Sequence, residues 1–181
     1  MTLEELWKLF PISLVEHDGT WRQQYDEIEN SLIVLLSDCP IERISHIGST
    51  AVDGIWAKNI VDVMVEFSEN ADLEKAAETL KDAGFTAMSN VGARISLNLG
   101  YTKDGFADKV YHIHLRHVGD NDELYFRDYL IAHPQAAKEY EALKLRLWKE
   151  FEHDRDAYTE AKTEFIRKNT AQARYEFEGR Y

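Results

Sequence analysis

The chain has 181 residues, of which 44% are hydrophobic and 30% charged, and its formal net charge is -12. This is the composition of a globular protein, and the length suits one sizeable hydrophobic core, so we expect a single domain over residues 1–181. The acidic balance argues against DNA or RNA as partners, because binding their phosphates requires clustered positive charge. A small phosphorylated ligand needs only a few local cations and stays open.

The sequence predicts no membrane partner and a cytoplasmic location. No apolar run approaches the roughly 20 residues that span a bilayer. The N-terminal segment carries early acidic residues and lacks the basic region of a signal peptide. Cys39 is the only cysteine, so an internal disulfide is excluded, which suits a reducing compartment. The sequence does not indicate an oligomeric state.

The first half of the chain alternates predicted helices with predicted strands. Apolar residues recur at helical spacing over residues 20–37. Strands are predicted at residues 41–47 and 59–67, and the second is so continuously apolar that we expect it in the centre of a sheet, covered on both faces. A helix over residues 71–83 follows and ends at Gly84.

Two more predicted strands precede a helical C-terminal half. Residues 93–101 and 109–116 alternate as strands do, and Asp104-Gly105 between them predicts a hairpin turn. From about residue 121 the pattern favours helices, at residues 122–133, 134–151 and 155–174. This order predicts an α/β or α+β fold in which helices pack on a small mixed sheet.

The stretch "HIGSTAVDGIWAKNIVDVMVEF" places a carboxylate inside an apolar strand shortly after a turn of small residues. At Gly48 and Ser49 a ligand can approach the backbone, and a short helix beginning there would favour an anion. An ionised Asp62 in a covered strand needs a cation, hydrogen-bond donors or water. The plain alternative is an ordinary turn followed by an edge strand. Glu66 shares the face of Asp62 but lies near the strand end, where we expect it to be solvated.

A pair of histidines lies in "VYHIHLRH". His112 and His114 are two positions apart, so both project from one face of a strand. Two imidazoles so placed can hold a metal ion if a neighbouring strand supplies a carboxylate. The alternative is a pair of hydrogen-bonded histidines on a half-exposed face. His46, two residues before Gly48, is expected near the same site.

Several positive side chains could balance the charge of a phosphate. Arg offers a bidentate fork and Lys a mobile point charge. Taken singly, each is an ordinary surface charge, although Lys144 follows an apolar stripe and Lys162 lies four residues after Tyr158, which favours inward-facing positions. The candidates are Lys58, Arg94, Arg127, Lys144 and Lys162, with Tyr158 beside them. No P-loop, dinucleotide-binding, zincin or nucleophile-elbow motif is present.

These segments together resemble the GrpB family, a group within the nucleotidyltransferase superfamily. The resemblance covers nearly the whole chain in order, through "ISLVEHDGTW", the stretch around Asp62, "HIHL", "FRDYLIAHPQAAKEYEALK" and "YTEAKTEFI". It implies a nucleotidyltransferase-like mixed sheet flanked by helices, with a Gly-Ser turn that contacts nucleotide phosphates. Carboxylates spaced D-x-D would bind divalent ions, and Asp62 matches the first of them.

The sequence departs from that pattern at Met64, which stands where the resemblance implies the second carboxylate. Glu66 could substitute for it, or a single Mn or Zn ion rather than Mg could bind to Asp62, His112 and His114, or no metal binds. The implied function is metal-dependent transfer of a nucleotidyl or phosphoryl group to a small acceptor. The alternatives are a degenerate protein that binds a nucleotide or phosphometabolite, and a protein-interaction module.

Overall fold

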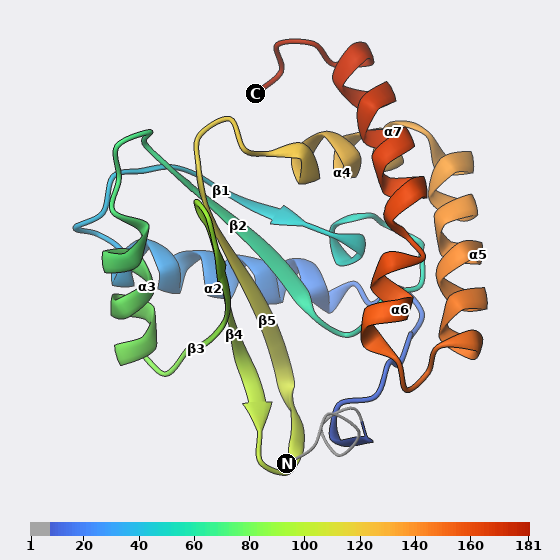
Figure 1. Cartoon of the computed structure of the whole chain (residues 1–181), viewed down its shortest axis with the longest axis horizontal. Coiled ribbons are helices and arrows are strands. Elements are labelled where there is room, and N and C mark those ends of the chain that lie inside the picture. The colour runs from blue at the N-terminus through green and yellow to red at the C-terminus, as the bar shows by residue number, and fades with distance from the viewer. Residues whose placement is uncertain (1–7) are drawn as a thin grey trace.

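The computed structural model describes residues 8–181 (Figure 1). The start of the N-terminal segment, which we expect not to be a signal peptide, lies outside this range. Five strands are described: β1 (Ile41–Ile47), β2 (Val61–Phe67), β3 (Thr86–Val91), β4 (Arg94–Thr102) and β5 (Gly105–His117). They form one sheet in the order β1-β2-β5-β4-β3, in which β2 and β5 run parallel and the other neighbours antiparallel. The predicted mixed sheet is therefore confirmed.

Helices occupy most of the remaining described residues. Helix α2 (Thr20–Leu35) precedes the strands, and α3 (Leu73–Asp82) lies between β2 and β3 in the chain. Four form the C-terminal half: α4 (Asp122–Ala132), α5 (Pro134–Glu150), α6 (Arg155–Glu160) and α7 (Thr163–Glu176). In Figure 1 the C-terminal helices gather at one side of the sheet, beyond the end of β1. Across residues 8–181, none of the helices combines the length and apolarity that crossing a bilayer requires.

One face of the sheet is apolar and carries the main core. Val61, Val63 and Val65 project from β2 to this face and are fully buried, as the continuous apolar run predicts. Helices α2 and α3 contribute the other side of this core. Burying each such side chain contributes about 1.5–3 kcal/mol. This core packs against β2 and β5, and it thereby fixes the positions of the side chains on the opposite face of these two strands.

The opposite face of the sheet is polar at its centre. In the parallel register Asp62 pairs with His112, Met64 with His114 and Glu66 with Arg116. In the antiparallel register of β4 with β5, Asn98 pairs with His112 and Ser96 with His114. Paired residues in a sheet project to the same side, so the register alone brings Asp62 and both histidines onto one face.

Two expectations about the fold are wrong, and one strand was not predicted. Glu66 is not solvated: its side chain is 0% exposed, forms an ion pair with Arg43 at 3.1 Å and accepts a hydrogen bond from Asn121 at 2.9 Å. Strand β3 is absent from the prediction, because all its residues are exposed and leave no alternating pattern. The helix predicted over residues 155–174 is two helices, since the chain turns at Ala161 and Lys162 between α6 and α7.

Candidate functional site

The turn after β1 brings the backbone close to the carboxylate of β2. Gly48 has φ 72°, and a Cβ atom there would lie 2.8 Å from Oδ2 of Asp62. Glycine meets both demands, since it tolerates positive φ and has no side chain. A three-residue 3-10 turn, Ser49–Ala51, follows directly. The missing side chain of Gly48 therefore lets the turn pack closely against Asp62.

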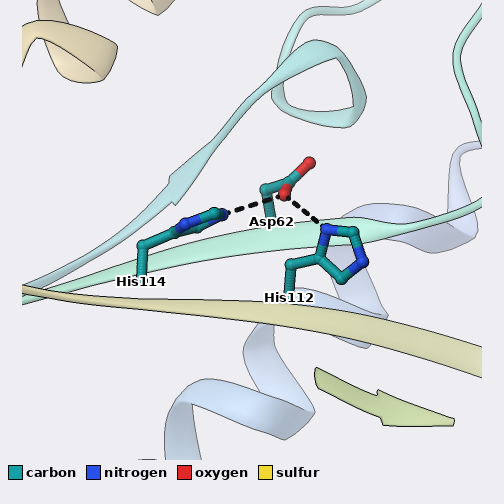
Figure 2. A group of neighbouring side chains, drawn as sticks. All are labelled: Asp62, His112 and His114. Carbon is teal, nitrogen blue, oxygen red and sulfur yellow. Dashed lines mark hydrogen bonds and ion pairs between the residues drawn. The ribbon is translucent and has the colours of Figure 1, made fainter. Parts of the chain in front are cut away.

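Asp62, His112 and His114 form one cluster (Figure 2). Oδ1 of Asp62 lies 3.3 Å from Nδ1 of His112 and 3.1 Å from Nε2 of His114. The three side chains are 28%, 25% and 22% exposed, so solvent reaches them. The expected convergence of the acid and the two imidazoles is thus present in the structure.

The outward nitrogen of each imidazole has its own partner. Nε2 of His112 lies 2.9 Å from the hydroxyl of Tyr101, which also accepts a hydrogen bond from Arg155 at 3.0 Å. Nδ1 of His114 lies 3.2 Å from Oγ of Ser96. Such outer partners fix the orientation of histidines that ligate metals. Tyr101, Arg155 and Ser96 were not predicted; the alternation of residues 93–101 could have indicated Ser96.

The cluster favours an ionised Asp62. Desolvation alone would raise the pKa of the Asp62 carboxyl, but the hydrogen bonds from His112 and His114 outweigh it and hold this pKa well below its usual range. Asp62 is consequently an anion at all physiological pH values, ready to accept hydrogen bonds or a cation.

The donor set suits a divalent cation of intermediate hardness. One donor atom from each of Asp62, His112 and His114 can be chosen so that all lie within 4.8 Å of one another. A carboxylate oxygen with two imidazole nitrogens suits zinc, manganese or iron better than magnesium, which prefers oxygen ligands. Glu66 does not replace the missing second carboxylate, because Arg43 and Asn121 already bind it.

A small cavity of about 190 Å³ opens beside Asp62 and is lined by three lysines. Lys58 and Lys162 lie over the ring of Tyr158, with Nζ 4.6 Å and 4.3 Å from its centroid. Lys144 is 3% exposed and donates hydrogen bonds to Oγ of Ser49, at 2.9 Å, and to the carbonyl of Trp56. The inward-facing positions expected for Lys144 and Lys162 are confirmed.

Burial lowers the pKa values of these three lysines. Desolvation is the main cause in each case, and their mutual repulsion adds to it for Lys58 and Lys144. The pKa falls to about 7 for Lys58, about 7 for Lys144 and about 8 for Lys162. An anion in this cavity would restore the full positive charges, so the cavity is suited to bind phosphate groups.

Three other candidates lie away from the lysine-lined cavity: His46, Arg94 and Arg127. His46 pairs with Val63 in the sheet register, so it projects to the α2 face, where its ring stacks on Tyr25 at 4.9 Å. Desolvation lowers the pKa of His46 to about 4, which keeps it neutral. Arg94 forms an ion pair with Asp120. Neither residue lines the small cavity, nor a larger cavity that also includes Asp62 in its lining.

Arg127, the third, also has a structural position. It donates hydrogen bonds to the carbonyl of His46 at 2.9 Å and to the hydroxyl of Tyr181 at 2.7 Å, and it contacts Asp128. These contacts tie α4 to β1 and to the last residue. The structure thus does not bring Arg127 to the phosphate-sized cavity.

A larger cavity of about 690 Å³ is lined by Asp62 and His114 together with residues of α4 and α7. The two cavities share a wall made of four residues: Gly48, Ser49, Asp62 and Tyr140. Asp62 therefore lies where the lysine-lined cavity meets the larger one, and His114 lines the larger one only.

Known proteins are similar to this chain in sequence and in fold. The glutamate-rich protein GrpB of Alkalihalophilus pseudofirmus is 35% identical over 162 residues, which cover 86% of this chain and 91% of that protein. The crystal structure of the conserved protein GrpB from Enterococcus faecalis superposes with a TM-score of 0.77 at 26% identity, covering 91% of this chain and 99% of that one.

A more distant structure shares the fold alone. A mutant of the Cid1 poly(U) polymerase bound to MgATP has a TM-score of 0.55 at 13% identity, over 82% of this chain and 46% of the polymerase. The family model described as GrpB protein matches residues 11–172. Because this match spans most of the sequence, the chain belongs to the GrpB family.

Proposed function

We propose that the protein transfers a nucleotidyl group from a nucleoside triphosphate to a small acceptor, with the help of a divalent metal ion. The observation that carries the proposal is that Asp62, which clusters with His112 and His114, lines both the lysine-lined cavity and the wider one. The nucleotidyltransferase-like fold supports it. The polymerase structure that shares this fold contains bound MgATP.

The residues have distinct roles in this proposal. Lys58, Lys144 and Lys162 hold the phosphates of the donor, and their charges stabilise the leaving pyrophosphate. Asp62 and the two histidines hold the metal, which when bound neutralises phosphate charge and makes the acceptor hydroxyl more nucleophilic. Gly48 lets the donor and the backbone approach Asp62 closely.

The reaction balances without a further reactant. A new bond forms between the acceptor oxygen and the α-phosphorus, and the bond from this phosphorus to the bridging oxygen breaks. Pyrophosphate leaves with that electron pair, and the hydroxyl proton passes to solvent water. The products are the nucleotidylated acceptor and pyrophosphate.

The test is pyrophosphate release from each of ATP, GTP, CTP and UTP, with magnesium, manganese or zinc. We expect Asp62→Asn to lower turnover at least ~100-fold, because a ligand to the metal is lost. Asp53→Asn removes the same charge from a fully exposed carboxylate nearby and should leave turnover unchanged. Equal turnover in wild type and Asp62→Asn would refute the mechanism.

One observation favours a second candidate function. Met64, which stands where the second carboxylate is implied, is fully buried and cannot ligate a hard cation. A protein that binds the nucleotide without transferring it would have this feature. It would show nucleotide binding that survives EDTA, with no pyrophosphate formed under any metal.

A further inference from the structure

We propose that the cavity of about 690 Å³ is the acceptor site, and that it takes a small non-anionic molecule with an apolar body and a hydroxyl group. This inference rests on the proposed function, because it assigns the second substrate of the same site. It excludes two classes of acceptor in particular, the end of a nucleic acid and a phosphorylated metabolite.

The partition of charge between the cavities assigns the two substrates. The small cavity collects Lys58, Lys144 and Lys162, whereas none of these lysines lines the larger one. Triphosphate groups gain most where the cations are, so the donor phosphates belong in the small cavity. The larger cavity also includes Asp62 in its lining, so an acceptor bound there would lie next to the same carboxylate.

The larger cavity has an apolar wall. Ile47, Phe126 and Ile166 contribute side chains to it from β1, α4 and α7. Phe126 packs edge-to-face on Tyr140, with ring centroids 5.2 Å apart, so the aromatic wall is fixed in place. Cavities of this size and lining typically enclose an organic molecule rather than an ion.

The charged groups of the larger cavity disfavour an anion. Arg167 is paired with Glu164 at 2.8 Å, and Arg174 is hydrogen-bonded to Asp122. Asp62 and Glu123 also line the cavity, and Glu123 forms an ion pair with Arg116 at 3.8 Å. Carboxylates thus outnumber guanidinium groups in the lining, and both guanidinium groups already have acidic partners, so the lining disfavours an anion and accepts amines or neutral alcohols.

The binding test uses two probes with the same phenol ring and opposite charges: tyramine, an amine, and 4-hydroxyphenylacetate, an acid. Backbone amide shifts are followed by NMR at millimolar probe concentrations. We expect tyramine to shift amides lining the larger cavity and to bind ~10-fold more tightly than the acid, a difference typical of one favourable charge contact. Equal or tighter binding of the acid, or no shift at these amides with tyramine, would overturn the proposal.

A cavity-filling variant locates the site. Ala171 lines the cavity and is exposed, so Ala171→Trp fills space without disturbing the core. Gln172→Trp places the same indole one position further along α7, where the residue does not line the cavity. Tyramine binding should be lost in Ala171→Trp and kept in Gln172→Trp; loss in both or in neither would contradict the assignment.

Nucleotide binding separates this inference from the proposed function. We expect Ala171→Trp to keep the affinity for the nucleoside triphosphate within ~2-fold, while Lys144→Met lowers it ~10-fold or more. If Ala171→Trp weakens nucleotide binding as much as Lys144→Met does, the larger cavity belongs to the nucleotide, so the acceptor assignment fails while the proposed function survives. If wild type binds none of the four triphosphates, the proposed function fails instead.

Discussion

Each imidazole of the cluster has two neighbours that compete for its single ring proton when it is neutral. With the proton on the inner nitrogen, His112 and His114 both donate to Asp62. A metal ion needs a lone pair on that nitrogen, so the proton must move to the outer one, where Tyr101 and Ser96 can accept it. The same residues thus serve both arrangements, so in the proposed metal site Tyr101 and Ser96 would tune the affinity for the ion.

The close approach of Gly48 to Asp62 gives a prediction with an internal control. Gly48 and Gly54 have similar φ angles, 72° and 76°. A Cβ atom added at Gly48 would lie 2.8 Å from Oδ2 of Asp62, whereas one added at Gly54 would have no neighbour within 4 Å. Gly54→Ala should cost ~1 kcal/mol of stability from the backbone angle alone. Gly48→Ala should cost ~1–2 kcal/mol more, because the methyl group overpacks the carboxylate and because ψ of -172° with this φ is open essentially to glycine alone.

Chemical denaturation of both variants measures this difference in the free energy of unfolding. The metal affinity of Gly48→Ala should fall as well, since Asp62 must shift, while Gly54→Ala should bind metal like wild type. Equal destabilisation by the two substitutions would show that the turn does not pack tightly against Asp62.

At the scale of helices and strands, periodic patterns of apolar residues predict the elements correctly. The sequence does not predict features that depend on contacts with distant parts of the chain. The apolar run before and after Asp62 predicts β2 correctly, and the His-x-His spacing predicts one face of β5. The burial of Glu66 was not predictable from its own strand, because Arg43 and Asn121 reach it from other elements. Strand β3 has no buried face, so no alternation indicates it.

The Glu66 contacts show how the sheet is joined to the C-terminal helices. The carboxylate lies on β2, Arg43 on β1, and Asn121 precedes α4. A buried carboxylate that loses its cation is costly. This arrangement holds α4 against the polar face of the sheet, and α4 in turn forms part of the larger cavity.

Removing Arg43 should therefore destabilise the fold. We expect Arg43→Ala to lower the free energy of unfolding by ~2 kcal/mol, since Glu66 is left buried without a cation. Arg22→Ala breaks an exposed pair with Asp26 and should cost less than ~0.5 kcal/mol. Adding Glu66→Gln to Arg43→Ala should recover part of the loss; no recovery in urea denaturation would show that Arg43 acts through packing alone.

For the whole molecule, the contrast lies between a net charge of -12 and three lysines enclosed in one small cavity. A net negative charge disfavours polyanions in general, while the cavity gathers three cations that a small anion could contact. Its cost is that folding moves these lysines out of water, which lowers the pKa values of Lys144 and Lys162 to about 7 and about 8.

This cost predicts opposite effects of pH on stability and on binding. Between about pH 7 and pH 10 the unfolded chain holds more protons on these lysines than the folded one, so the free energy of unfolding should rise with pH. Over the same range the affinity for inorganic tripolyphosphate should fall, because the folded lysines lose their charge.

The matched variant is Lys144→Met, which removes one such group. Urea denaturation at several pH values should show a smaller rise in stability for Lys144→Met than for wild type, and calorimetry should show a flatter fall in tripolyphosphate affinity. Identical pH profiles for the two proteins would mean that Lys144 is charged in the folded state throughout.

Strand β3 has a practical consequence for all these measurements. Its residues are exposed, it pairs only with β4, and none of them lines either cavity. A fluorophore or capture group attached at Ser89 or Asn90 would accordingly report on tumbling or tether the molecule to a sensor chip while both compartments stay open to their ligands.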